Sequence, residues 1–105
     1  MNGERVLERG KMVYAQAAAP GHAGDIETQT RRVLERIDEL LAAAGSDKSK
    51  LLTAKIRLAD MSLLDAHAAV WNEWLASEKA PLRLYTQGAL ARPEMLVEVM
   101  VTALK

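Results

Sequence analysis

The stretch PLRLYTQG (residues 81–88), followed after a turn by LVEVMVTAL (residues 96–104), decides the fold of this 105-residue chain. Both segments are rich in apolar residues, and Ala91-Arg92-Pro93-Glu94 lies between them, which predicts two strands with a turn. Glu98 interrupts the second apolar run, and a carboxylate is costly to bury there without a partner. If the two strands form a hairpin, Arg83 and Glu98 can approach the same end of it.

Arg83 and Glu98 are the residues of this stretch best suited to chemistry. Arginine binds a carboxylate through two parallel hydrogen bonds. A half-buried glutamate can activate a water molecule. The alternative is a cross-strand ion pair at the surface, which contributes little stability. On these two residues alone, both interpretations stay open and the ion pair is the commoner outcome.

Two amphipathic helices are predicted upstream of these strands. Apolar residues recur at steps of three and four from Ile26 to Ala44, Asp25 can cap this helix, and Gly45 can end it. A second apolar stripe runs from Leu63 to Trp74, and Ser62 can cap it. Two helices of this kind pack most economically on one face of one sheet.

Three further strands complete the predicted order of strand, strand, helix, strand, helix, strand, strand. Val6-Leu7 and Lys11–Tyr14 flank a turn at Gly10, and residues 53–60 alternate apolar with charged positions. We therefore expect an α+β protein in one domain over residues 1–105. The sheet face away from the helices must be covered, and a partner subunit is the expected cover.

Composition narrows the function classes. Fourteen basic and fourteen acidic residues cancel, and few aromatic side chains are present, so we expect no nucleic-acid partner. No cysteine is present, which excludes disulfides, thiolate zinc sites and cysteine nucleophiles. No apolar run reaches signal or membrane-spanning length, which predicts a cytoplasmic protein without a membrane partner.

Known catalytic motifs are missing from the chain. No phosphate-binding glycine loop, HExxH or GxSxG is present. His22 and His67 carry no metal-ligand spacing, so no metal site is expected. His67 lies on the apolar stripe of the second helix, where it can be a general base or, more commonly, a packed histidine. Trp71 and Trp74 are expected to anchor the core or an interface.

The order and spacing of several short stretches resemble the RidA/YjgF family of reactive-intermediate (imine) deaminases, which is also described as endoribonuclease L-PSP-like. The resemblance extends over nearly the whole chain. The matching stretches are Asp25-Ile26, Gln29-Thr30-Arg31, Val33-Leu34, Ile37, Leu40-Leu41-Ala42, residues 44–52, residues 58–61, residues 70–74, Pro81-Leu82-Arg83 and Leu96-Val97-Glu98-Val99.

The resemblance implies a chorismate-mutase-like fold, with a mixed sheet backed by two helices, and a homotrimer with ligand clefts between subunits. It also implies hydrolysis of enamine or imine intermediates, such as 2-aminoacrylate, to a 2-keto acid and ammonia, without metal or organic cofactor. Arg83 matches the arginine that holds the substrate carboxylate, and Glu98 matches the glutamate that positions water. The expected small-molecule partner is a 2-imino or 2-keto acid.

Three positions that we expect at the substrate site depart from the family pattern. The family usually carries a Gly-Gln pair after its second strand. Here a gapless alignment places Ala17-Ala18 at the pair, and a gapped one places Ala15-Gln16 there. An asparagine of the second helix is replaced by Ala68, and a small residue or cysteine after the arginine is replaced by Tyr85. We therefore expect Arg83, Tyr85 and Ala17 to contact substrate.

Two other functions remain open on the sequence. The chain can be a non-enzymatic trimer that binds a small carboxylate ligand or a protein partner in the intersubunit cleft. Some relatives are described as ribonucleases or translation inhibitors, and the neutral charge makes this reading the least favoured.

Overall fold

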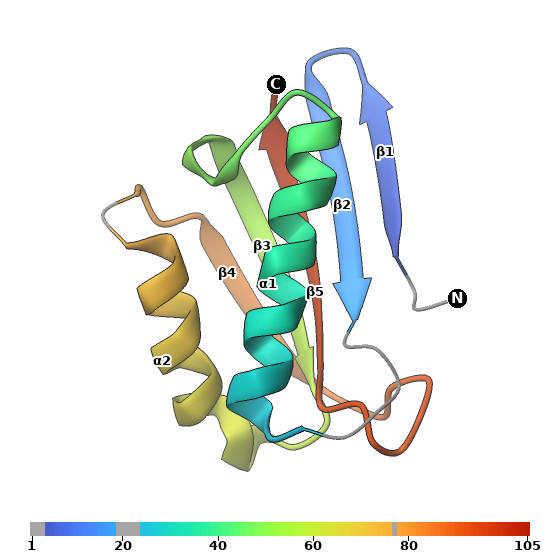
Figure 1. Ribbon diagram of the computed structural model, residues 1–105, viewed down its shortest axis with the longest axis vertical. Coiled ribbons are helices and arrows are strands. Elements are labelled where there is room, and N and C mark those ends of the chain that lie inside the picture. The colour runs from blue at the N-terminus through green and yellow to red at the C-terminus, as the bar shows by residue number, and fades with distance from the viewer. Residues whose placement is uncertain (1–3, 19–23, 77) are drawn as a thin grey trace.

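A five-stranded mixed sheet forms the framework of the computed structural model, which describes residues 4–18, 24–76 and 78–105. The strand order is β1-β2-β5-β3-β4. Helices α1 and α2 both lie on one face of this sheet (Figure 1), which confirms the expected α+β fold. In chain order the elements are β1 (Arg5–Arg9), β2 (Met12–Ala18), α1 (Ile26–Ala43), a 3-10 turn (Lys48–Lys50), β3 (Leu51–Leu58), a second 3-10 turn (Met61–Leu63), α2 (Leu64–Leu75), β4 (Leu82–Gln87) and β5 (Val97–Leu104).

The two C-terminal strands do not form the hairpin that the sequence suggested. Strand β3 lies between them, paired in parallel with β4 and antiparallel with β5. The reason is that α2 returns the chain to the starting end of β3, so β4 must run parallel to β3 as in other strand-helix-strand units. Strand β5 then takes the other edge of β3 and also pairs with β2.

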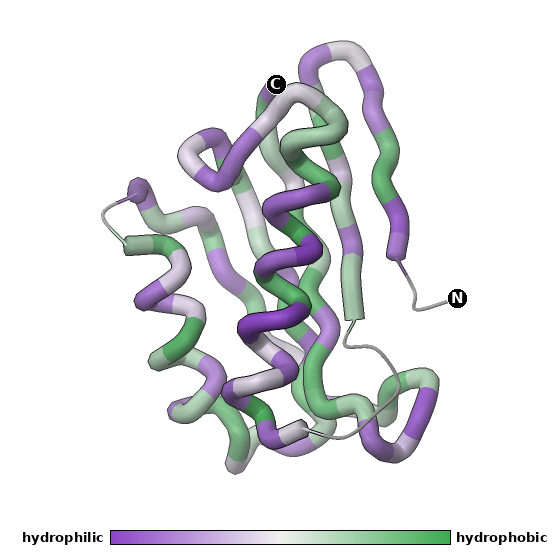
Figure 2. The backbone as a smooth tube through the Cα atoms, viewed as in Figure 1, coloured by the Kyte–Doolittle hydropathy of each residue, from purple (hydrophilic) through white to green (hydrophobic). Residues whose placement is uncertain are grey.

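Side chains alternate strictly along β5. Val97, Val99, Val101 and Ala103 are buried at 1% exposure or less, because they face the helices. The intervening residues are only half-buried and lie on the opposite, open face of the sheet. The same separation is visible on α1, where hydrophobic and hydrophilic bands alternate along the chain (Figure 2). The aliphatic core therefore lies between the helices and one face of the sheet.

Helix α1 begins and ends where the sequence predicts. The Asp25 side chain accepts a hydrogen bond from the Thr28 amide at 2.8 Å. At the other end Gly45 has a φ of 80°, and the Ser46 amide donates to the Leu41 carbonyl at 2.8 Å. This is the bonding of a helix terminated by a left-handed glycine, and it satisfies carbonyls that the last turn leaves open.

Two local expectations are wrong. Ser62 does not cap α2, because a short 3-10 turn comes first and the Asp60 side chain caps that turn by accepting from the Ser62 amide. Strand β2 does not end at Tyr14, as expected, but continues through the alanine-rich residues 15–18. Ala15 and Ala17 are fully buried beneath α1, so close packing of the helix on the sheet favours small residues there. Neither α1 nor α2 is long and apolar enough to cross a membrane.

The buried side chain of Gln29 connects the start of α1 to the start of β5. Its amide nitrogen donates to the carbonyls of Gly24 and Glu94, at 3.0 and 2.9 Å. Its amide oxygen accepts from the Leu96 amide at 2.8 Å. Gln29 is 2% exposed, so these backbone groups depend on it for part of their hydrogen bonding.

We expect Gln29→Leu to lower the free energy of unfolding by about 2–3 kcal/mol, because it leaves partly buried backbone groups without partners. Chemical denaturation at one fixed protein concentration measures this. Glu35→Leu, on the exposed side of the same helix, is the matched control and should change stability by less than about 0.5 kcal/mol. Equal effects of the two substitutions would show that the Gln29 bonds contribute nothing specific.

Candidate functional site

Arg83 lies on the helix side of β4, at the edge of the sheet. Its register partner is Ala54 of β3, whose side chain is buried under the helices, and paired residues share a face. The guanidinium carbon lies 5.6 Å from the ring centroid of Trp71 in α2 and 5.6 Å from that of Tyr85 in β4. Among the described residues Arg83 forms no ion pair.

This arrangement makes Arg83 suited to bind an anion. Stacking on aromatic rings stabilises a cation and fixes the plane of the guanidinium. The N–H donors lie in that plane, so its edge stays available for the two parallel hydrogen bonds that a carboxylate accepts. Trp71 is 1% exposed and therefore a rigid support.

His67 forms the buried wall behind Arg83. It is fully buried on α2, and its Nδ1 lies 3.1 Å from the Thr30 hydroxyl of α1. Its ring meets the Tyr85 ring edge to face, with centroids 5.4 Å apart. Burial, and secondarily the charge of Arg83, lower the pKa of His67 to about 4. The imidazole is therefore neutral at neutral pH, and its surroundings favour the packed histidine over the general base.

Tyr85 is half-buried beside Arg83. Burial raises the pKa of its hydroxyl, and the neighbouring Arg83 partly opposes this. The buried Tyr85 hydroxyl and His67 Nε2 have no hydrogen-bond partner in the described part of the chain. Tyr85 thus lies against Arg83, and its expected contact with substrate stays a prediction.

Glu98 lies on the open face, at the start of β5. Its carboxylate accepts a hydrogen bond from the Gln16 amide of β2 at 3.1 Å. The Tyr14 hydroxyl lies 3.1 Å from the amide oxygen of Gln16 and 2.9 Å from the sulfur of Met100. Glu98 forms no ion pair with any described residue, although Arg57 of β3 is its register partner. The expected cross-strand ion pair with Arg83 is absent as well.

Arg83 and Glu98 therefore do not meet within one copy of the chain. Arg83 aligns through Ala54 with Val101, three positions along β5 from Glu98 and two strands away. At ~3.3 Å per residue and ~4.8 Å per strand, their Cα atoms are about 14 Å apart. Their side chains also leave opposite faces of the sheet. One small ligand cannot contact both in a single protomer.

The remaining expected site residues are placed differently. The Ala17 side chain is fully buried under α1, so its methyl group belongs to the core and only its backbone is near the open face. Ala68 is half-buried on α2, next to His67. Gln16, rather than Ala17, lies beside Glu98. Its alternation with the buried Ala15 and Ala17 is the sequence signal that could have identified it.

Comparison with known proteins assigns this chain to a protein family. The family model described as Endoribonuclease L-PSP matches residues 4–105. The chain belongs to this family. A RutC family protein of Haemophilus ducreyi is 34% identical over 100 residues, which cover 95% of this chain and 86% of that protein. The 3-aminoacrylate deaminase RutC of Acinetobacter baylyi is 34% identical over 82 residues, 78% of this chain and 64% of that protein.

Solved structures agree with the Endoribonuclease L-PSP assignment. A member of the YjgF protein family from Neisseria meningitidis superposes with a TM-score of 0.89 at 35% identity, and the match covers 95% of this chain and 84% of that one. The YjgF/YER057c/UK114 family member of Mycobacterium tuberculosis gives a TM-score of 0.86 at 27% identity, covering 96% and 85%. The resemblance to the RidA/YjgF family is thereby confirmed.

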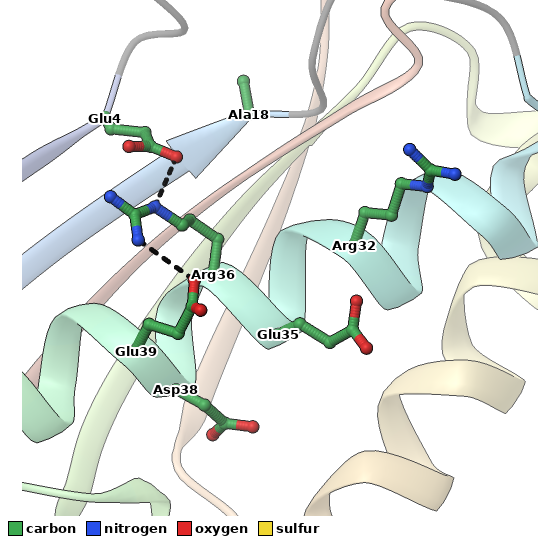
Figure 3. Close-up of a pocket in the computed structure, with 7 residues that line it drawn as sticks. All are labelled: Glu4, Ala18, Arg32, Glu35, Arg36, Asp38 and Glu39. Atoms are coloured by element: carbon green, nitrogen blue, oxygen red, sulfur yellow. Dashed lines mark hydrogen bonds and ion pairs between the residues drawn. The ribbon is translucent and has the colours of Figure 1, made fainter.

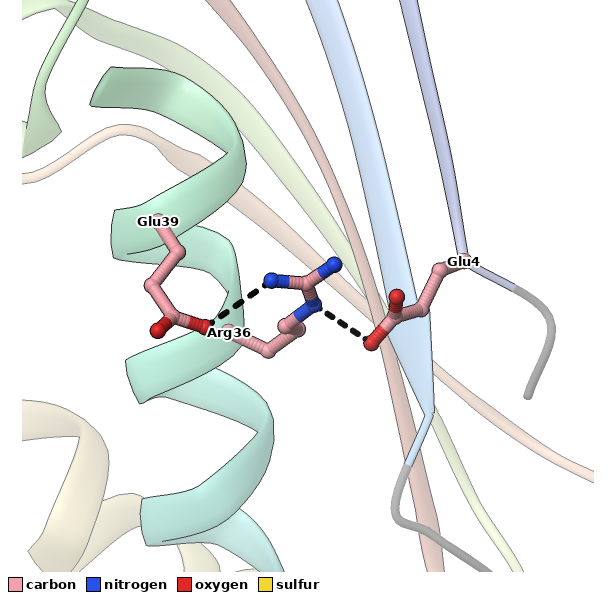
Figure 4. A network of polar contacts seen from close by, with 3 residues as sticks. All are labelled: Glu4, Arg36 and Glu39. Atoms are coloured by element: carbon pink, nitrogen blue, oxygen red, sulfur yellow. Dashed lines mark hydrogen bonds and ion pairs between the residues drawn. The ribbon is translucent and has the colours of Figure 1, made fainter. Parts of the chain in front are cut away.

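A separate groove of about 510 Å³ lies away from Arg83. It is lined by Glu4, Ala18 of β2 and five charged side chains of α1 (Figure 3). Arg36 occupies its centre, with its guanidinium 2.7 Å from the Glu4 carboxylate and 3.0 Å from that of Glu39 (Figure 4). Because Arg36 pairs with the carboxylates of Glu4 and Glu39, these contacts hold the segment before β1 against α1.

Within residues 4–18, 24–76 and 78–105, no three histidine or carboxylate side chains lie close enough together to hold a metal ion. His22 falls outside the described residues.

The lowered pKa of His67 predicts acid sensitivity of this family member. The unfolded imidazole titrates near 6.5 and the folded one near 4, so the unfolded state binds more protons between these values and stability falls as pH falls. We expect His67→Met to remove about 2.5 kcal/mol of the loss between pH 7 and pH 4.5. Urea unfolding of both proteins at the two pH values measures the difference. Arg83 and Tyr85 are present in both proteins. An equal loss of stability in wild type and variant would therefore show that the loss does not come from His67.

Proposed function

We propose that this protein hydrolyses small 2-imino acids and their enamine tautomers, of the 2-aminoacrylate type, to 2-keto acids and ammonia. The observation that carries the proposal is the guanidinium of Arg83, which lies against the Trp71 and Tyr85 rings, forms no ion pair within the described part of the chain, and is suited to hold a carboxylate. The family assignment adds to it, because one relative bears the name 3-aminoacrylate deaminase.

In the proposed reaction Arg83 fixes the substrate carboxylate and Glu98 positions a water molecule. Water adds to the C=N carbon while Glu98 accepts one proton from it and passes that proton to the nitrogen, which gives a carbinolamine. The hydroxyl proton of the carbinolamine is then transferred through Glu98 to the nitrogen, the C–N bond breaks, and ammonia leaves as the C=O bond of the 2-keto acid forms. Orientation and one proton-handling group suffice for this step, and none of it requires a metal or organic cofactor. We place the reaction in the cytoplasm.

The proposed site is formed by two copies of the chain. Arg83 and Glu98 lie on opposite faces of the sheet, so a ligand that touches both requires Arg83 from one copy and Glu98 from another. The open face also exposes large apolar side chains, of which Leu82 is 76% exposed and Leu84 57%. Covering such a surface favours association. A homotrimer with three such clefts meets both requirements.

Subunit mixing tests the proposal directly. Arg83→Ala is expected to lower kcat/KM about 10–100-fold, because a charge-assisted carboxylate contact is lost. Glu98→Gln is expected to lower kcat about 100-fold or more, because the proton acceptor is lost. Co-assembling the two impaired variants should raise activity above that of either alone, up to about a quarter of wild type in randomly mixed closed rings. The 2-imino acid is generated in situ and its loss is followed as the semicarbazone.

Arg32→Ala, an exposed arginine of α1, is the matched control and should keep wild-type activity. Activity that stays absent in well-mixed assemblies would contradict a site shared between subunits. Carboxylate binding in a thermal-shift assay, lost in Arg83→Ala but without any turnover by wild type, would instead favour a non-enzymatic ligand-binding trimer.

A further inference from the structure

A line of polar side chains on the open face ends at the Glu98 carboxylate. It begins at Tyr14 in β2, passes through Gln16 two residues later and crosses to β5. The register places Gln16 opposite Met100 and Ala18 opposite Glu98, so Gln16 reaches Glu98 diagonally. Diagonal neighbours on antiparallel strands are within reach of long side chains.

The donor and acceptor groups of these side chains set the direction of the hydrogen bonds between them. An amide oxygen can only accept, so the Tyr14 hydroxyl, 3.1 Å away, donates to Gln16 Oε1 in preference to the weakly accepting sulfur of Met100. The NH₂ group of Gln16 must then point the other way, toward Glu98 Oε2 at 3.1 Å. By donating to Oε1, the Tyr14 hydroxyl favours the amide orientation in which the NH₂ group faces Glu98.

Glu98 is thus held by a neutral donor although a cation is available. Arg57 is its register partner on β3, yet the Arg57 guanidinium extends to the carbonyl of Ala89 at 3.4 Å. An ion pair with arginine would stabilise the charged carboxylate and weaken it as a base. A primary amide orients one oxygen with a smaller effect of this kind, and it leaves Oε1 to accept from water.

We propose that Gln16 is a positioning residue for Glu98, and that Tyr14 acts on Glu98 through the orientation of the Gln16 amide. The catalytic consequence rests on the function proposed above, whereas the contact itself does not. The charged and titratable groups on the open face around Glu98 are its register partner Arg57, Lys55 two residues away along β3, and Tyr14 on β2. Arg5 of β1 is the register partner of Gln16.

Three substitutions test the proposal through kinetics. Gln16→Leu should lower kcat about 10–100-fold with KM changed less than about 2-fold, because Arg83 is untouched. Tyr14→Phe should lower kcat about 3–10-fold by releasing the amide. Gln16→Glu places a second carboxylate beside Glu98 and should shift the acid limb of the kcat–pH profile upward by about one unit. Arg9→Leu, also exposed on the open face, is the matched polar-to-leucine control.

A second readout separates this proposal from the proposed function. With ¹³C-labelled glutamate, the side-chain carboxyl of Glu98 is titrated by NMR in wild type, Gln16→Glu and Arg9→Leu, with Glu98→Gln identifying the signal. An upward shift of its midpoint in Gln16→Glu alone supports the contact even if no substrate is turned over. An unchanged midpoint, or kcat within 2-fold of wild type in Gln16→Leu of an active enzyme, overturns the proposal.

Discussion

The alternation of side chains along β5 is the constraint on which the rest of the structure depends. This strand bonds to a neighbour on both edges, and its valines pack beneath the helices. A slip of one residue would turn Glu98 into the core and the valines outward, at a large cost in free energy. The same register places Gln16 beside Glu98 and aligns Arg83, through β3, with the middle of β5. Core packing and the candidate site are therefore fixed together.

Much of the fold follows from local patterns. The bounds of α1 could be predicted because a periodic apolar stripe, an aspartate cap and a terminal glycine all agree. Strand order could not be predicted in the same way, since nothing within β4 or β5 specifies the neighbour. The parallel pairing of β4 results from the passage of α2 across the sheet. The strand character of the alanine run is likewise set by the helix above it, since alanine itself favours other conformations.

The candidate site was predicted by residue type and only partly by position. Arg83 and Glu98 were identified as a cation and a carboxylate in otherwise apolar strands, with support from the family resemblance. Their separation on opposite faces depends on pairing through β3, which is not readable from either strand alone. The missing glycine predicted a substrate contact at Ala17, but the side chain of this residue lies in the core. The neighbouring Gln16 has the parity that faces Glu98.

The edge position of β1 has a consequence for the order in which the protein opens. All five residues of β1 are exposed, and among the described strands its backbone pairs only with β2. Two side-chain ion pairs tether it further, Glu4 with Arg36 of α1 just before the strand and Glu8 with Lys105. Such a strand exchanges its amide hydrogens early, by local opening that leaves the valine core intact. Its register partners include Tyr14 and Gln16. The strand that is least protected against exchange therefore lies next to Tyr14 and Gln16, which position Glu98. Local opening of β1 would disturb these contacts well before global unfolding.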